Sequence, residues 1–236
     1  MITISHSFSN SNDNFNYLKK WLLDEYNQFD KGFYSNIEII EKAFHNDKLI
    51  TFDIDEVPVG LVVYNDYDGF VEIDILTIQY KYRNNGYGSM FYKLLENHFK
   101  NEDYLAFKLF CNPPESETFW KKMGFNPFPE NIYGLPELSY YKPLINTTIQ
   151  SQNFNLKNKL ELWDVEPHLA SSTNPQWCWE IKSLNQKLDS PIFHPANPNW
   201  NIRLTINDKI LKEDKVKYFS MVNPIDLSPF LLIKNL

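Results

Sequence analysis

The sequence predicts a mixed α/β fold, in which a mostly antiparallel central sheet is flanked by helices and followed by a second, small β-rich domain. Apolar strand-like runs alternate with amphipathic helical segments in the first part of the chain, and only strand-like runs stand out in the second. All seven glycines precede residue 135, whereas nine of the fourteen prolines follow it. We therefore expect a first domain over residues 1–145, a polar linker over 146–159 and a β-rich domain of unknown role over 160–236.

The elements of the first domain follow from the spacing of apolar residues. Leu18 and Leu22 recur at helical spacing, and Asn36 stands where it could cap the next helix. Turn residues such as Asp68-Gly69 separate three apolar runs, which predicts an antiparallel meander. The expected strands are 2–8, 49–54, 59–64, 70–79, 105–110 and 138–144, and the expected helices are 14–29, 37–44, 86–99 and 115–123.

The second part reads as strands at 160–165, 177–181, 200–206 and 209–219. Asn207-Asp208 lies between the last two and suits a tight hairpin turn. This part contains four of the six tryptophans, Trp163, Trp177, Trp179 and Trp200. Tryptophan is usually core or interface material, and an aromatic ligand face is the alternative.

Composition excludes several classes of protein. A net charge of −7, with a pI near 5.3, argues against a nucleic-acid partner. A mean hydropathy of −0.44 and an N-terminus without a secretory pattern predict a cytoplasmic chain with no membrane partner. Cys111 and Cys178 are too few for a disulfide framework. The histidines show no ligand spacing, so we expect no metal.

The most informative segment is LTIQYKYRNNGYGSM, residues 76–90, in which an apolar strand leads through a loop into a helix. Backbone amides at the start of a helix have no helical acceptor and carry the positive end of the helix dipole, so they bind phosphate oxygens. Gly86 and Gly88 would let the backbone approach such a ligand closely. The alternative is an ordinary strand-to-helix turn.

This segment resembles motif A of the GNAT superfamily of acyl-CoA-dependent N-acyltransferases, whose pattern is Q/R-x-x-G-x-G/A. Leu76 and Ile78 match the hydrophobic pair that precedes the loop in that family. The run FWKKMGF, residues 119–125, resembles motif B, and YYKPL, residues 140–144, resembles the closing strand. The resemblance covers residues 1 to about 145 and implies a GNAT-like fold there; the C-terminal part resembles no family that we can name.

The resemblance implies acetyl-CoA as the co-substrate. In this family the main chain of the motif A strand pairs with the pantetheine arm of the cofactor, often at a bulge where the strand separates from its neighbour. The backbone amides of the following loop hold the pyrophosphate. Asn112, after the following strand, is a further candidate for the same arm, and Trp120 stands in motif B at the cofactor site. The implied cofactor-binding residues are Leu76, Thr77, Ile78, Arg83, Asn84, Asn85, Gly86, Tyr87, Gly88, Ser89, Asn112 and Trp120.

The reaction that the resemblance implies benefits from a general base, because an alkyl amine is mostly protonated at pH 7. Glu72 stands where histone-modifying members have a strand glutamate, and Asp74, two residues on, is expected on the same side. Solvated carboxylates on an exposed strand face are the alternative.

The tyrosine that protonates the departing thiolate in many members is replaced by Trp120, whose N–H is only a hydrogen-bond donor. Tyr133, Tyr140 or Cys111 could serve instead, or the thiolate could leave without help. A nucleophilic Cys111 is not favoured, because no histidine stands near it in the sequence.

The sequence thus predicts an N-acetyltransferase that acts on a small-molecule or protein primary amine by direct transfer in a ternary complex. The acidic first domain suits a cationic acceptor. The alternative is a non-catalytic acyl-CoA sensor or scaffold with the same fold. A homodimer stays open.

Overall fold

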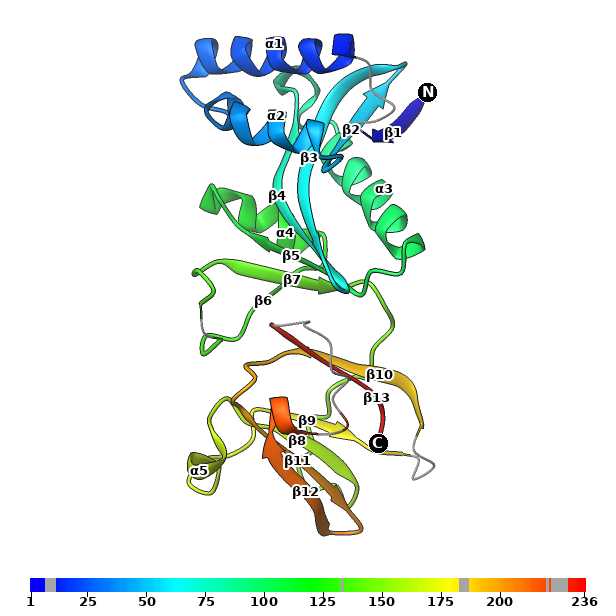
Figure 1. Cartoon of the computed structure of the whole chain (residues 1–236), viewed down its shortest axis with the longest axis vertical. Helices are drawn as coiled ribbons and strands as arrows, with labels where there is room; N and C mark the ends of the chain where they lie inside the picture. The colour runs from blue at the N-terminus through cyan, green and yellow to red at the C-terminus, as the bar shows by residue number, and fades with distance from the viewer. Residues whose placement is uncertain (7–11, 133, 183–186, 220, 222–228) are drawn as a thin grey trace. The chain divides into compact units, whose positions relative to one another are not determined.

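The computed structural model describes residues 1–6, 12–132, 134–182, 187–219, 221 and 229–236. In this part the chain forms two compact units, Met1–Phe125 and Asn126–Leu236 (Figure 1).

The first unit contains a sheet in which the strands lie side by side in chain order: β1 (Ile2–His6), β2 (Leu49–Ile54), β3 (Val57–Tyr67), β4 (Phe70–Ile78) and β5 (Ala106–Phe110). The neighbours β1–β4 pair antiparallel, and β4 pairs with β5 in parallel. This arrangement confirms the predicted mixed, mostly antiparallel sheet and its central meander. Asp55 and Glu56 both take positive φ, 51° and 67°, as a tight hairpin turn requires.

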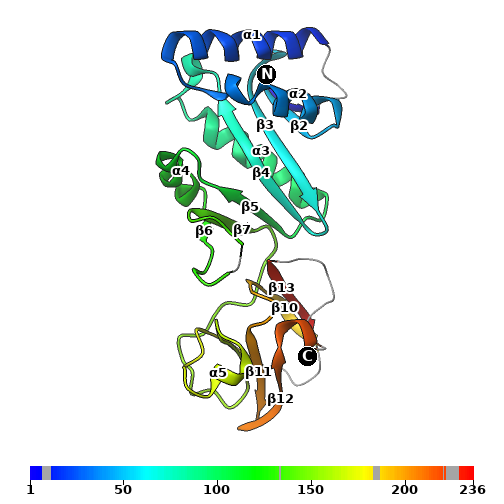
Figure 2. The ribbon, with the colours of Figure 1, turned by 60° about the vertical axis from the view of Figure 1, so that its left-hand side comes forward.

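Helices cover both faces of this sheet (Figures 1 and 2). They are α1 (Asn12–Phe29), α2 (Ile37–His45), α3 (Tyr87–Asn101) and α4 (Glu117–Lys122). α1 and α2 pack on one face, where Leu22 and Ile40 share a buried cluster with Val63. α3 packs on the other, where Phe99 lies 5.0 Å from the ring of Tyr64. Val63 and Tyr64 are consecutive, so the period-2 alternation of β3 supplies both layers.

The second unit is β-rich. β6 (Asn126–Pro127) pairs with β7 (Ser139–Pro143), and a four-stranded sheet has the order β12 (Lys209–Lys215), β11 (Asn201–Ile206), β8 (Lys159–Leu162), β9 (Trp177–Glu180). β10 (Lys187–Pro195) and β13 (Phe230–Asn235) form a separate ribbon, and α5 (Pro167–Ala170) is a single turn. Asn207 and Asp208 take φ of 49° and 63°, which confirms the predicted hairpin turn.

Three strands of the second unit were not predicted from the sequence: the two-residue β6, β10 and β13. β10 contains Pro191 and Pro195, which argue against a strand when the partner is unknown. β13 is a short apolar run that only its pairing with β10 identifies. Three of the tryptophans, Trp163, Trp179 and Trp200, are at most 3% exposed. They are therefore core residues and do not form a ligand face.

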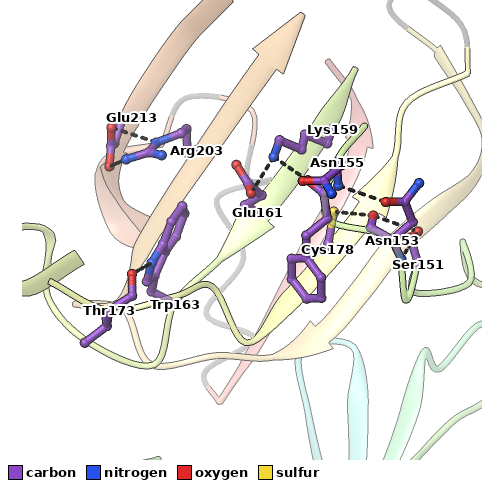
Figure 3. A network of polar contacts seen from close by, with 11 residues as sticks. Ser151, Asn153, Asn155, Lys159, Glu161, Trp163, Thr173, Cys178, Arg203 and Glu213 are labelled. Atoms are coloured by element: carbon purple, nitrogen blue, oxygen red, sulfur yellow. Dashed lines mark hydrogen bonds and ion pairs between the residues drawn. The ribbon is translucent and has the colours of Figure 1, made fainter. Parts of the chain in front are cut away.

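Polar contacts also hold the second unit together (Figure 3). The Trp163 indole N–H donates to the Thr173 carbonyl at 3.2 Å, and the Arg203 guanidinium lies 4.7 Å from the Trp163 ring centroid. Arg203 also donates to both oxygens of Glu213, at 2.9 and 2.8 Å. The segment expected to be a linker is hydrogen-bonded into the same unit, because the Ser151 N–H donates to the Cys178 carbonyl at 2.8 Å.

Candidate functional site

The site is built where β4 and β5 part. Their parallel pairing runs from Phe70–Ala106 to Ile73–Leu109, and β4 then continues to Ile78. The register between β4 and β3 slips at the same place, because Val63 pairs with Ile75 while Tyr64 pairs with Ile73. Asp74 is therefore the extra residue of a bulge. Beyond it, no described residue of β5 pairs with β4, so the strand edge of residues 74–78 is open toward β5.

A cavity of about 590 Å³ lies at this fork. Seven of the residues predicted to bind the cofactor line it: Leu76, Thr77, Ile78, Arg83, Gly88, Asn112 and Trp120. Phe119 and Ser116 contribute from the region of α4, and residues 31–33 and 36 contribute from the connection between α1 and α2. The cavity thus joins the predicted cofactor strand to the loop after α1, all within the first unit.

The loop before α3 has the conformation that exposes amides. Asn84 and Gly86 take φ of 63° and 81°, and α3 begins at Tyr87. The first amide to donate within the helix is that of Met90, to the Gly86 carbonyl at 3.1 Å. The amides of Tyr87, Gly88 and Ser89 therefore have no acceptor within the helix, and they carry the positive end of its dipole. Asn85 is bonded locally, from its Nδ2 to the Arg83 carbonyl at 3.0 Å.

The side chain of Arg83 is turned back onto the protein. Its Nε donates to the Ile78 carbonyl at 2.6 Å, and one terminal nitrogen donates to Glu25 Oε2 at 2.6 Å. Glu25 is only 7% exposed and also accepts the Tyr80 amide. The guanidinium is thus occupied by Ile78 and Glu25. A phosphate bound at this loop would therefore be held by backbone amides, which agrees with the role predicted for residues 83–89.

Glu25 is a residue that the sequence analysis missed. It follows Leu18 and Leu22 at helical spacing, on the stripe that α1 buries. A carboxylate in such a stripe is almost never fully buried without a partner. An acidic residue on the buried face of a predicted helix is therefore the sequence signal that could have identified Glu25.

The two predicted carboxylates form a polar cluster on β4. Lys108 Nζ donates to Glu72 Oε1 at 2.7 Å, and Asn65 Nδ2 donates to Asp74 Oδ2 at 2.6 Å. Burial alternates along this part of β4, since Glu72 and Asp74 are less buried than Ile73 and Ile75. Desolvation, and then the negative charge of Glu72, raise the pKa of Asp74. Neither is among the described residues that line the cavity.

The model of the acetyltransferase (GNAT) family matches residues 15–125, a segment that contains the whole cavity. Residues 15–125 are a GNAT acetyltransferase domain. The matched segment ends at residue 125, and no curated protein matches the sequence.

Several solved structures are similar to the region of the GNAT domain. One is a GNAT acetyltransferase from Staphylococcus aureus Mu50, 16% identical, with a TM-score of 0.47; the match covers 61% of this chain and 99% of that one. A second is the PaiA N-acetyltransferase of Thermoplasma acidophilum in complex with coenzyme A, 16% identical, with a TM-score of 0.46 and the same coverage. A third is the N-acetylglutamate synthase of Neisseria gonorrhoeae, 12% identical, with a TM-score of 0.47, covering 62% of this chain and 36% of that one.

The GNAT domain departs from its family's usual pattern at Trp120. This side chain is 7% exposed and packs against the rings of Tyr92 and Phe125, at 6.0 and 5.1 Å. It is a wall of the cavity and has no acidic proton to give. The thiol of Cys111 is buried, and desolvation raises its pKa.

Of the predicted acids outside the GNAT domain, Tyr140 is buried on β7 in the second unit, whereas Tyr133 lies outside the described residues. In the described part of the chain, no helix is long and apolar enough to cross a membrane. The same residues contain no group of three or more metal-ligating side chains.

Proposed function

We propose that the protein is an N-acyltransferase that moves an acetyl group from acetyl-CoA to a primary amine by direct transfer in a ternary complex. The observation that carries this proposal is the cavity at the fork of β4 and β5, inside a GNAT acetyltransferase domain. It combines an open strand edge with the amino end of α3. These are the two features that an extended amide chain ending in a pyrophosphate requires.

The residues at the cavity fit the cofactor. The open main chain of Leu76–Ile78 would pair with the pantetheine amides as an added strand. Asn112, which also lines the cavity, would hold the same arm with its side-chain amide. The amides from Arg83 to Ser89 would receive the pyrophosphate, with Gly86 supplying the left-handed turn that presents them.

When bound, acetyl-CoA would supply an acyl thioester, and this chain would supply a base for the incoming amine. Asp74 is the better placed of the two carboxylates. It stands at the bulge where the strand edge opens, and desolvation raises its pKa, which makes it a stronger base than an ordinary aspartate. Glu72 is held by Lys108, so we assign it the role of keeping negative charge beside Asp74.

The proton for the departing sulfur has no assigned donor in the cavity wall. The Trp120 N–H could only hydrogen-bond to a thiolate. A thiol has a pKa of about 8.5, so the thiolate is a moderate leaving group that can take its proton from water. Tyr133, Tyr140 and Cys111 are the residues to test for this step.

A non-catalytic acyl-CoA sensor is the second candidate, and two observations favour it: Trp120 in place of tyrosine, and Glu72 bound to Lys108. Calorimetry with CoA and acetyl-CoA, followed by thiol release across a panel of amines, separates the two. Binding with turnover supports the enzyme, and binding without turnover supports the sensor. Absence of CoA binding contradicts both. We further expect a cytoplasmic protein that binds no nucleic acid, membrane or metal, and we leave a homodimer open.

A further inference from the structure

The charges at the cavity are all of one sign. Among the described lining residues the ionic side chains are Lys31 and Arg83, and none is a carboxylate. The surrounding region has the opposite sign, since residues 1–125 contain twelve Lys and Arg against nineteen Asp and Glu. The next question is which of these two cations is free to bind a ligand.

Arg83 does not supply a free charge. Its ion pair with the 7% exposed Glu25, at 2.6 Å, neutralises it, and its Nε is occupied by the Ile78 carbonyl. A ligand that drew Arg83 away would leave the Glu25 carboxylate buried and unpaired, which is costly. The guanidinium is therefore committed to the fold.

Lys31, unlike Arg83, is not paired with a carboxylate of the described residues. It is exposed, it follows the end of α1, and it has no hydrogen bond, ion pair or ring contact to any residue that the structure describes. Gly32 next to it has no Cβ to crowd the wall, and Phe33 and Asn36 complete this side of the cavity. Lys31 is thus the free charge on the wall that the loop after α1 supplies.

We infer that the acceptor is an amine that also carries an anionic group, a carboxylate or a phosphate, and that Lys31 binds this group. The inference rests on the proposed function and reverses the cationic acceptor expected from net charge. A contact with Lys31 is barely screened, whereas charges spread over the domain act across more than the Debye length of about 8 Å at physiological salt. The local cation therefore decides the preference. The phosphates of CoA are the other anions that could reach Lys31, and the experiment separates them.

The test uses matched amines that differ only in the anion: tyrosine with tyramine, histidine with histamine, and phosphoethanolamine with ethanolamine. Their binding to the full-length protein is followed by ligand-observed NMR, with saturating CoA and without it, and acetyl transfer is followed by thiol release. We expect the anionic member of at least one pair to bind about tenfold or more tightly than its partner, the usual strength of a charge-assisted hydrogen bond.

Three variants test Lys31 itself. Lys31→Met should remove that preference while leaving CoA affinity within about twofold, Lys31→Arg should retain it, and Lys20→Met, an exposed lysine of α1, should change nothing. Equal binding within every pair, or a preference that survives Lys31→Met, overturns the inference. So does a loss confined to CoA binding, because Lys31 would then serve the cofactor. A Lys31-dependent preference without acetyl transfer supports the inference and contradicts the proposed enzyme instead.

Discussion

The guanidinium of Arg83 lies 2.6 Å from the carboxylate of Glu25, which ties the loop before α3 to the C-terminal part of α1. Arg83 is the sole arginine of the first unit, and this contact commits it to the protein. Under the proposed function, phosphate binding would fall to backbone amides, whose position depends on the loop that Arg83 braces. One ion pair thus links the proposed cofactor loop to the helix that precedes Lys31, which lines the cavity.

We expect Glu25→Gln to weaken both the fold and CoA binding. The amide still accepts the Tyr80 N–H but loses the charge that holds Arg83. A fully buried ion pair costs about 3–5 kcal/mol when one partner is removed, and the 39% exposure of the Arg83 side chain reduces our expectation to about 1–2 kcal/mol. Urea unfolding measures the loss, and calorimetry measures CoA affinity. Glu41→Gln, which removes a more exposed ion pair of Lys19, should cost under about 0.5 kcal/mol; an equal effect of both variants contradicts the bracing role.

Gly86→Ala should destabilise the protein by about 1–2 kcal/mol, because a left-handed φ is unfavourable for any residue with a Cβ. Apart from its two chain neighbours, no atom of the described residues lies within 4 Å of the added methyl, so the cost is backbone strain and not a clash. Gly134 has the same φ of 81° and the same empty surroundings, but it belongs to the second unit. Gly134→Ala should therefore lose a similar amount of stability and keep normal CoA affinity. Gly86→Ala should lose both stability and CoA affinity. If the two variants bind CoA equally well, the 83–89 loop is not the phosphate site.

Gly88→Val separates binding from stability. A Cβ at this position would lie 3.6 Å from the Phe119 ring, an ordinary contact, and Gly88 lines the cavity. We expect little change in the unfolding free energy apart from the difference in helix propensity between glycine and valine in the first turn of α3. CoA affinity should fall by tenfold or more, the effect of losing about 1.4 kcal/mol of contacts. Undiminished CoA binding by a folded Gly88→Val protein would place the cofactor elsewhere.

Asp74→Asn should lower kcat/KM about 10²–10⁴-fold at neutral pH, the usual contribution of a general base. Its raised pKa means that Asp74 becomes active only as pH rises through that value, so wild-type activity should fall on the acid side. The defect of the variant should shrink toward the amine pKa of about 10.4, where the acceptor loses its own proton. Glu72→Gln is expected to have the smaller effect, and the reverse order would make Glu72 the base.

Acid should weaken the second unit through His194. This ring is 3% exposed between Trp177 and Trp179, and burial lowers its pKa from 6.5 to about 4. A folded pKa below the unfolded one means that this stability is complete above pH 6.5 and is lost as pH falls toward 4. The loss approaches about 3 kcal/mol at pH 4.

Urea unfolding between pH 7 and 4 measures this loss, and NMR titration of the imidazole protons gives the pKa directly. In His194→Gln the pH dependence should be shallower. His168→Gln, whose side chain is 69% exposed in the wild type, should leave it unchanged. A His194 ring that titrates near 6.5 in the folded protein would contradict the prediction.

Much of the first unit is determined by local pattern. The spacing of Leu18 and Leu22 gives α1 its buried stripe, and the alternation through Val63 and Tyr64 gives β3 its two faces. The loop before α3 is equally local, because glycine at position 86 permits a turn that few other residues tolerate. These features depend on neighbours in the chain, which is why residues 76–90 alone were enough to propose a cofactor site.

The tertiary structure alone decided how that site is charged and opened. The Glu25–Arg83 and Glu72–Lys108 pairs join residues 58 and 36 positions apart, and no spacing rule brings such partners together. The parting of β4 from β5 after Ile73 coincides with a slip of register against β3, and β13 is recognisable as a strand only beside β10. Such contacts form between segments that close long loops, so their geometry depends on the packing of the whole unit.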